Sequence, residues 1–286
     1  MTQPVLELAA VTIRQSLAAN PRPFIAIAGL CGSTRQATAE AELALSLGYQ
    51  AGLLTLAALK DADDEAILEH CLNVAQTIPI IGFYLQPSVG GRPFSHAFWR
   101  RFAEIPNVIA IKIAPFNRYQ TIDVVRAVVE AGRDDIALYT GNDDNIIADL
   151  LTPFAFQQNG SIVTRRIAGG LLGHWGVWTR KAVELFSEIR KAREQPRIDS
   201  AWLTRGAEVT DMNAAVFDPA HGFAGCIPGI LEVLRRQGLA ATRNCLDPHQ
   251  TLSAGQGDEL TRVSRAYPDL IDDSFVQEHR DRWLSE

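Results

Sequence analysis

The chain has 286 residues, of which 47% are hydrophobic and 21% charged, which is typical of a globular protein with a sizeable core. Its formal net charge of −6 and its lack of a basic cluster disfavour binding to nucleic acid or to an anionic membrane. No apolar run is long enough to span a bilayer, and Met1–Ala10 lacks the basic-then-apolar pattern of a signal peptide. Four scattered cysteines without a CxxC pair favour a reducing, cytoplasmic setting.

Short apolar runs alternate with stretches of helical period along the first part of the chain. A lone helix is predicted over Val5–Ala19. The predicted strands begin near Phe24, Ala51, Pro79, Val108, Ile136 and Gly160, with spacings of 27, 28, 29, 28 and 24 residues. The helices between them are predicted over Ala37–Leu47, Asp64–Thr77, Ser95–Glu104, Thr121–Glu130 and Asp144–Gln157. This even repeat of strand and helix predicts a parallel sheet and favours a TIM-type (β/α)8 barrel over a doubly wound sheet.

The rest of the chain, from about Gly173, is predicted to be helical. Its helices are expected over Trp178–Glu194, Ala201–Ala215, Ile227–Gln237, Glu259–Ala266 and Ser274–Leu284. Only six strand starts precede them, whereas the barrel has eight strands, and the deficit lies at the amino end. We therefore expect an incomplete barrel of six parallel strands over residues 1–175, with the strands from Phe24 and Gly160 at its open edges. Helices of residues 176–286 are expected to pack on this barrel.

Alternation within the strands predicts which side chains face the interior. The bulkier face, with Phe83 on one strand and Ile111 on the next, suits the helix layer. The smaller face carries Tyr84 and Lys112. Because neighbouring parallel strands lie about 4.8 Å apart, we expect these two side chains to face the same cavity.

Lys112 is the strongest candidate for a catalytic residue. The chain has only 4 lysines against 23 arginines, and this one lies inside an apolar strand. Removal of its amine from water would lower its pKa, which would let the neutral amine attack a ketone and form a Schiff base. The alternative is a lysine at a strand end whose ammonium reaches solvent.

Tyr84 lies one strand earlier, also near a carboxyl end. A phenol beside Lys112 could move protons during imine chemistry. The alternative is an ordinary core tyrosine, which is the commoner role of such a residue in a strand.

Two further segments place polar or charged residues at the ends of predicted strands. Gly141, Asn142 and the two aspartates after them close the fifth strand, where turn and helix-cap roles explain these residue types. Arg165 follows the predicted sixth strand and could bind a carboxylate, or it could be a solvated surface residue. None of the six histidines falls at a strand end, so we do not expect a metal site.

Several of these segments resemble the dihydrodipicolinate synthase/N-acetylneuraminate lyase family of class I aldolases. The run from Phe83 to Pro87 and the run from Ile109 to Lys112, with Tyr84 and Lys112 28 residues apart, resemble its tyrosine and Schiff-base lysine segments. The family's GDD turn is similar to the run that begins at Gly141, and its last strand to the run that begins at Gly160. The resemblance implies a cofactor-free lyase for a 2-oxo acid or sugar acid, assembled as a homodimer or homotetramer. The substrate contacts it implies are Gly141, Asn142, Ile162, Thr164 and Arg165.

The sequence also departs from the family's pattern. Family members begin with two further strands, the second of which ends in a hydroxyl pair that binds the substrate carboxylate. The tyrosine pair after the fourth strand is replaced near Lys60, the arginine of the synthases by Val89, and the glutamate after the lysine by Ile113. Dihydrodipicolinate synthesis is therefore not expected. Two alternatives to a lyase stay open, namely an incomplete, non-catalytic homologue and an oxo-acid-binding protein.

Overall fold

The computed structural model describes residues 2–170 and 174–285. The chain divides into two compact units, which are Met1–Tyr139 with Phe154–Ala168, and Thr140–Pro153 with Gly169–Glu286. This division differs from the boundary predicted at residue 175, because residues 140–153 join the second unit. Gly173, from which helical structure was predicted, lies outside the described residues.

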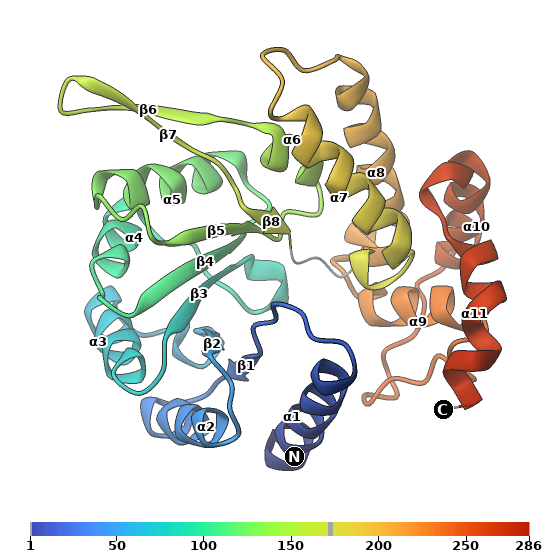
Figure 1. Cartoon of the computed structure of the whole chain (residues 1–286), viewed down its shortest axis with the longest axis horizontal. Coiled ribbons are helices and arrows are strands. Elements are labelled where there is room, and N and C mark those ends of the chain that lie inside the picture. The colour runs from blue at the N-terminus through green and yellow to red at the C-terminus, as the bar shows by residue number, and fades with distance from the viewer. Residues whose placement is uncertain (1, 171–173, 286) are drawn as a thin grey trace. The chain divides into compact units, whose positions relative to one another are not determined.

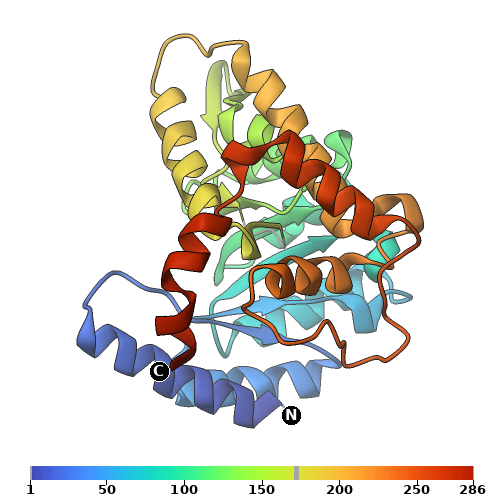
Figure 2. The same cartoon turned by 90° about the vertical axis from the view of Figure 1, so that its right-hand side faces the viewer.

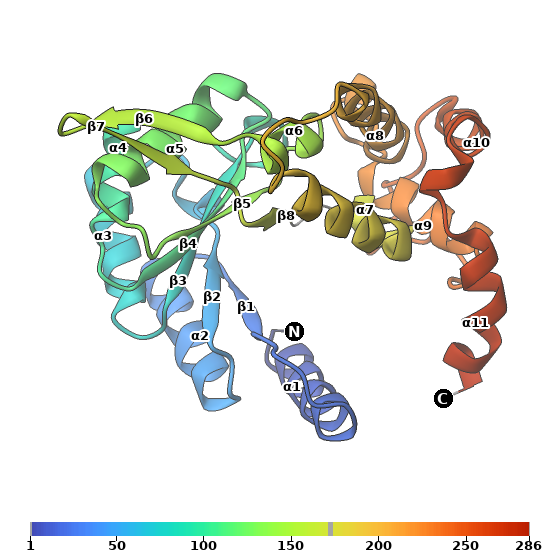
Figure 3. The same ribbon diagram turned by 45° about the horizontal axis from the view of Figure 1, so that its top comes forward.

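The first unit contains a sheet with helices along one face (Figures 1 and 3). Strands β1 to β4 pair in parallel, and β5 is the next strand in the order. The elements of this unit, in chain order, are α1 (Thr2–Ala19), β1 (Ile27–Leu30), α2 (Thr34–Ser46), β2 (Ala51–Leu54), η1 (Ala57–Leu59), α3 (Asp64–Ala75), β3 (Ile80–Leu85), η2 (Pro87–Val89), α4 (His96–Ala103), β4 (Val108–Ala114), α5 (Arg118–Glu130), β5 (Ala137–Thr140), β6 (Phe154–Gln158) and β7 (Ser161–Arg165).

Side-chain caps fix where three of the covering helices begin. Ser33, Asp63 and Ser95 each accept a hydrogen bond from the backbone amide three residues further on. These bonds satisfy amides that have no partner within the helix, which sets the first turns of α2, α3 and α4. The predictions of a cap at Ser95 and of a helix ahead of the first strand are confirmed.

A one-residue irregularity interrupts the pairing of β3 and β4. Ile80 pairs with Val108, whereas the next residue, Ile81, pairs with Ala110. Ile109 is therefore an extra residue in β4, as in a β-bulge. Beyond it the register is regular, and it sets Phe83 opposite Lys112.

The shifted register reverses the faces predicted for β3. Gly82 faces α4, because a β-carbon there would lie 2.7 Å from two ring carbons of Phe102. Tyr84, two residues further on, faces the same way and lies 4.9 Å from Trp99 between ring centroids. The prediction of Tyr84 inward and Phe83 outward is therefore wrong. In β4 the assignment was right, since Lys112 pairs with Phe83 on the opposite face, which we call the inner face.

The predicted sixth parallel strand is instead half of an antiparallel hairpin. β6 and β7 pair with each other and are joined by Asn159 and Gly160. Both linking residues have positive φ, 50° and 80°, as a two-residue type I′ turn requires. The hairpin packs on α5 (Figure 1), and the prediction that the strand from Gly160 forms an open edge of a parallel sheet is wrong.

The second unit is built mainly from helices. Its elements are α6 (Ile146–Leu151), β8 (Gly169–Gly170), η3 (His174–Gly176), α7 (Thr179–Ala192), α8 (Ala201–Phe217), η4 (Pro219–His221), α9 (Cys226–Arg236), α10 (Gln256–Ala266), η5 (Pro268–Leu270) and α11 (Asp273–Ser285). Figure 2 shows α10 and α11 as two red helices joined by a short link. The helices predicted for this region are confirmed, except that the one predicted over Asp144–Gln157 ends at Leu151. Pro153 follows closely and cannot continue a helix.

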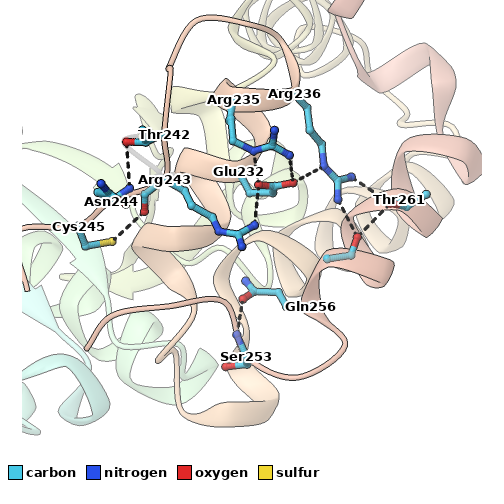
Figure 4. A network of polar contacts seen from close by, with 11 residues as sticks. Glu232, Arg235, Arg236, Thr242, Arg243, Asn244, Cys245, Ser253, Gln256 and Thr261 are labelled. Carbon is cyan, nitrogen blue, oxygen red and sulfur yellow. Dashed lines mark hydrogen bonds and ion pairs between the residues drawn. The ribbon is translucent and has the colours of Figure 1, made fainter. Parts of the chain in front are cut away.

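A buried carboxylate ties the loop between α9 and α10 to the helices around it (Figure 4). Glu232, only 3% exposed, accepts hydrogen bonds from Arg235 at 2.8 and 2.9 Å, from Arg236 at 2.9 Å and from the loop residue Arg243 at 3.2 Å. These bonds, that of Arg235 above all, hold the pKa of the Glu232 carboxyl at about 2. Arg236 also donates to Thr261 on α10, so one carboxylate organises two helices and the loop.

Replacement of Gly82 by alanine tests the packing of β3 against α4. We expect Gly82→Ala to lower the free energy of unfolding by about 1–3 kcal/mol, because the new methyl group overlaps the ring of Phe102. Gly29→Ala is the matched control, since a β-carbon in that strand meets nothing within 4 Å. Urea denaturation of both variants measures the difference, and equal stabilities would contradict the packing.

Glu232→Gln tests the buried carboxylate. Because its folded pKa lies near 2, below the ordinary 4.5, the ionised group stabilises the fold above about pH 4.5 and loses this effect as the pH falls towards 2. We expect the variant to lose up to about 3 kcal/mol at pH 7 and progressively less below pH 4.5. The control Glu259→Gln removes an exposed ion pair with Arg262 and should cost less than about 1 kcal/mol. A pH-independent difference would contradict this account.

Candidate functional site

Lys112 lies in the carboxyl half of β4 on the inner face of the sheet. Its ammonium nitrogen is 4.5 Å from the ring centroid of Phe83, the residue it pairs with on β3. The cation therefore lies against an aromatic face, which attracts it electrostatically. Its other neighbours along this face of β4 are Ala110 and Ala114, both buried. The predicted inward orientation of Lys112 at the carboxyl side of the sheet is confirmed.

A small hollow lies beside this position at the carboxyl ends of β2 and β3. Its volume is about 10 Å³, and Phe83 forms part of its wall together with Thr55 from the end of β2. Arg92 and Lys60 also line it. The guanidinium of Arg92 donates to the backbone oxygen of Ala62 at 2.5 Å and to Asp64 at 2.7 Å, so it fixes the rim. Sequence reasoning did not single out Thr55 or Phe83, since only the register of β3 reveals them.

Tyr84 does not share a cavity with Lys112. Its hydroxyl donates to the backbone oxygen of Phe94 at 3.3 Å and accepts from the Phe94 amide at 3.1 Å. The side chain is 1% exposed, and burial raises the pKa of its phenol above the ordinary value. Tyr84 thus joins β3 to the segment before α4, and the prediction of a cavity shared with Lys112 is wrong.

In the second unit, the turn that carries Gly141 and Asn142 is held by a buried carboxylate. Asp149, which is fully buried, accepts from Thr140 at 2.8 Å and from the Asn142 side-chain amide at 2.9 Å. Asn145 donates to the other carboxylate oxygen at 3.2 Å. The Asn142 side chain is therefore committed, at least in part, to the shape of the turn. Asp149 was not predicted, because an aspartate in a helix ordinarily faces solvent.

The same turn is also fixed by α8. Asn213 donates to the backbone oxygen of Asp143 at 2.6 Å, and Thr210 donates to that of Asp144 at 3.0 Å. The geometry of the turn thus depends on two helices of the second unit, α6 and α8.

The three remaining predicted substrate contacts all lie on the β6–β7 hairpin. Ile162 is 67% exposed and Thr164 is also exposed. Arg165 donates to the backbone oxygens of Asp134 and Ile136, at 2.9 and 2.6 Å, and so holds the amino end of β5. Arg165 is therefore held at the amino end of β5, whereas Lys112 lies towards the carboxyl end of β4. The position of Arg165 gives no support to a role in holding substrate beside Lys112.

Neither a metal cluster nor a membrane-spanning helix is found in the part of the chain that the structure describes. No group of three or more His, Cys, Asp or Glu side chains there could hold a metal ion. No helix of residues 2–170 or 174–285 is long and apolar enough to cross a bilayer.

Comparison with known proteins identifies relatives of one kind. No family model matches the chain. It is 29% identical over 142 residues to a 4-hydroxy-tetrahydrodipicolinate synthase of a Cyanothece species, which covers 49% of this chain and 46% of that protein. It is 30% identical over 131 residues to the synthase of Thiobacillus denitrificans, covering 45% and 42%. The matched segment thus spans less than half the length of either curated relative.

Solved structures extend the likeness to most of the fold. The dihydrodipicolinate synthase of Acinetobacter baumannii, complexed with pyruvate, gives a TM-score of 0.69 at 20% identity over 93% of this chain and 81% of that one. The Oceanobacillus iheyensis enzyme gives 0.67 at 17% identity over 94% and 80%. The chain is thus similar in sequence to dihydrodipicolinate synthases over about half of its length, and similar to them in fold over most of it. Its fold class, the TIM-barrel type of these synthases with helices at the carboxyl end, is confirmed.

Tyr84→Phe distinguishes a structural from a proton-transferring tyrosine. Loss of the hydroxyl leaves the buried Phe94 amide without its acceptor, so we expect the free energy of unfolding to fall by about 1–3 kcal/mol. Tyr119→Phe is the control, because Tyr119 is 84% exposed and its loss should change little. Urea denaturation measures both. Unchanged stability for Tyr84→Phe would argue against its hydrogen bonds with Phe94.

Proposed function

We propose that the chain is a lyase that forms a Schiff base between Lys112 and a 2-oxo acid or sugar acid. The neutral amine would attack the ketone carbon, a C–N bond would form, and the carbonyl oxygen would leave as water after taking up two protons. The resulting iminium would withdraw electrons from the neighbouring carbon, which allows aldol cleavage or dehydration. The position of Lys112 on the inner face of the sheet, against Phe83, is the observation that carries this proposal.

Phe83 would serve the imine chemistry through its charge distribution. The starting ammonium and the iminium are both cations, and an aromatic face attracts either one. The ring also covers one side of the nitrogen with apolar surface. We therefore propose that Phe83 holds the nitrogen of Lys112 in place while it exchanges its bonds to hydrogen for a bond to carbon.

The substrate is proposed from chemistry and from the relatives together. The curated relatives are named 4-hydroxy-tetrahydrodipicolinate synthases, and one solved structure is described as a dihydrodipicolinate synthase complexed with pyruvate. The positions where this chain departs from that family do not offer replacement groups. Val89 is an apolar residue that is 46% exposed, and Ile113 is fully buried. We therefore propose a 2-oxo or sugar acid other than the precursor of dihydrodipicolinate.

One observation favours a second candidate, an oxo-acid-binding protein that forms the imine without turnover. Tyr84, the predicted proton-transfer residue, uses its hydroxyl on the backbone of Phe94. Imine formation needs only the amine and solvent protons, whereas carbon–carbon cleavage needs a positioned acid or base. The two candidates differ in turnover and agree on the adduct.

Assembly and location are also proposals. We propose that the chain acts in the cytoplasm, where its four free cysteines would stay reduced. We also propose a homo-oligomer, on the resemblance to the synthases alone. One of the similar structures is described as the first monomeric dihydrodipicolinate synthase variant, which makes the oligomeric state a quantity to measure for this chain.

Reductive trapping tests the imine. We expect incubation with pyruvate and borohydride, followed by peptide mass spectrometry, to label Lys112 and to leave the other three lysines largely unlabelled. Lys112→Arg should abolish the adduct, because a guanidinium does not form the imine. Lys191→Arg, which changes an exposed lysine on α7, should keep it.

Phe83→Leu complements this test. It removes the aromatic face and keeps an apolar side chain, so the rate of adduct formation should fall about tenfold or less while the site of labelling stays the same. Equal labelling of all four lysines, or none at Lys112 in folded protein, would overturn both candidate functions. An adduct at Lys112 without release of product from any 2-oxo or sugar acid would support the binding protein.

A further inference from the structure

The second unit contains a groove of about 800 Å³ between α6 and α8. Both walls, and the lining residues 198–200 before α8, belong to this unit. Figure 3 shows the two helices side by side. We call this cavity the α6–α8 groove. Its volume falls in the range of small-molecule sites, which is about 300–1,000 Å³.

The walls of the α6–α8 groove are largely apolar. Ile147 and Leu151 come from α6, and Trp202 and Leu203 from α8. Leu203 is 75% exposed, and Ile198, which also lines the groove, is 42% exposed. These side chains leave a concave apolar surface in contact with water, which a ligand with an apolar body would cover.

A glycine in the middle of α8 keeps the groove open. Gly206 is a groove-lining residue inside a 17-residue helix, where glycine is less stable than alanine. The close packing of α6 does not require it, because a β-carbon there would lie 3.7 Å from the β-carbon of Ile147, an ordinary contact. A larger side chain at this position would instead fill the groove.

The charged side chains that line the groove are acidic. Two aspartates, Asp144 and Asp199, line it, and the lining residues include neither lysine nor arginine. Asp199 accepts from the Ala201 amide through one oxygen at 2.9 Å, which fixes the carboxylate beside the first turn of α8. The indole of Trp202 lies three residues further along, and an indole face attracts cations.

We propose that the α6–α8 groove binds an organic amine, a cation with an aromatic or aliphatic body. The body would cover Ile147, Leu151 and the Trp202 ring, and the ammonium would lie near the carboxylate of Asp199. This site is independent of Lys112, so the outcome of the imine test has no bearing on it.

Three probes with the same body separate charge from apolar contact. We would titrate the full chain with 4-phenylbutylamine, 4-phenylbutanol and 4-phenylbutyrate, and follow backbone amide chemical shifts. The amine should bind about threefold or more tightly than the alcohol, and the carboxylate most weakly, as a partly exposed ion pair implies. The shifts should be confined to α6, α8 and residues 198–200.

Two pairs of variants locate the binding. Gly206→Leu should weaken all three probes about tenfold or more, and Gly206→Ala less so, without loss of helix content. Ala214→Leu adds the same side chain at an exposed position of α8 outside the groove and should change nothing. Asp199→Asn should lower the affinity for 4-phenylbutylamine to about the affinity for 4-phenylbutanol. Its control is Asp247→Asn, because Asp247 accepts from a backbone amide two residues on in the same way.

Four results would overturn the proposal. Equal affinity for the three probes would show that the groove does not prefer a cation. Saturable binding that Gly206→Leu does not weaken would show that the probes bind elsewhere. If the chain self-associates and Leu203→Asp abolishes the association, a second copy of the chain covers the groove. Absence of saturable binding by any probe would also overturn it.

Discussion

The extra residue in β4 determines which side chain lies beside Lys112. Because side chains alternate along a strand, a shift of one residue exchanges the two faces of everything beyond it. The pairing of Ile81 with Ala110 sets Phe83 opposite the lysine and turns Tyr84 towards α4. The irregular pairing thus separates the Lys112 amine from the Tyr84 phenol and gives the amine the ring of Phe83 as its neighbour. The stability of α4 and the environment of Lys112 both follow from this register.

The two faces of β3 consequently have different roles, because one packs against α4 and the other lies beside Lys112. On the helix side, Gly82 leaves room for the ring of Phe102, and Tyr84 closes the cluster with two hydrogen bonds to Phe94. On the inner face, the ring of Phe83 lies under the Lys112 amine. A rigid, close-packed helix side holds the strand in place, and this helps to fix the position of the amine.

Local signals in the sequence predicted more of the fold than long-range signals did. The spacing of apolar runs located β2 and β4 at their first residues, and Ser95 marked the start of α4. The same spacing misled at Gly160, where the Asn159-Gly160 pair forms a hairpin turn that a repeat-based reading overlooks. Lys112 was placed correctly because its own strand alternates regularly after the bulge. The orientation of Tyr84 was predicted wrongly, because it depends on the register between β3 and β4. The sequence of β3 alone does not determine that register.

The turn at Gly141 and the α6–α8 groove depend on the same helix. Thr210, which donates to the backbone of the turn, is also a lining residue of the groove. Asn145, which holds Asp149 from the other side, lines it too. A displacement of α8 relative to α6 would therefore change the volume of the groove and the bonds of the turn together. Because coupling between two sites is reciprocal, whatever stabilises one arrangement of the turn also favours one width of the groove.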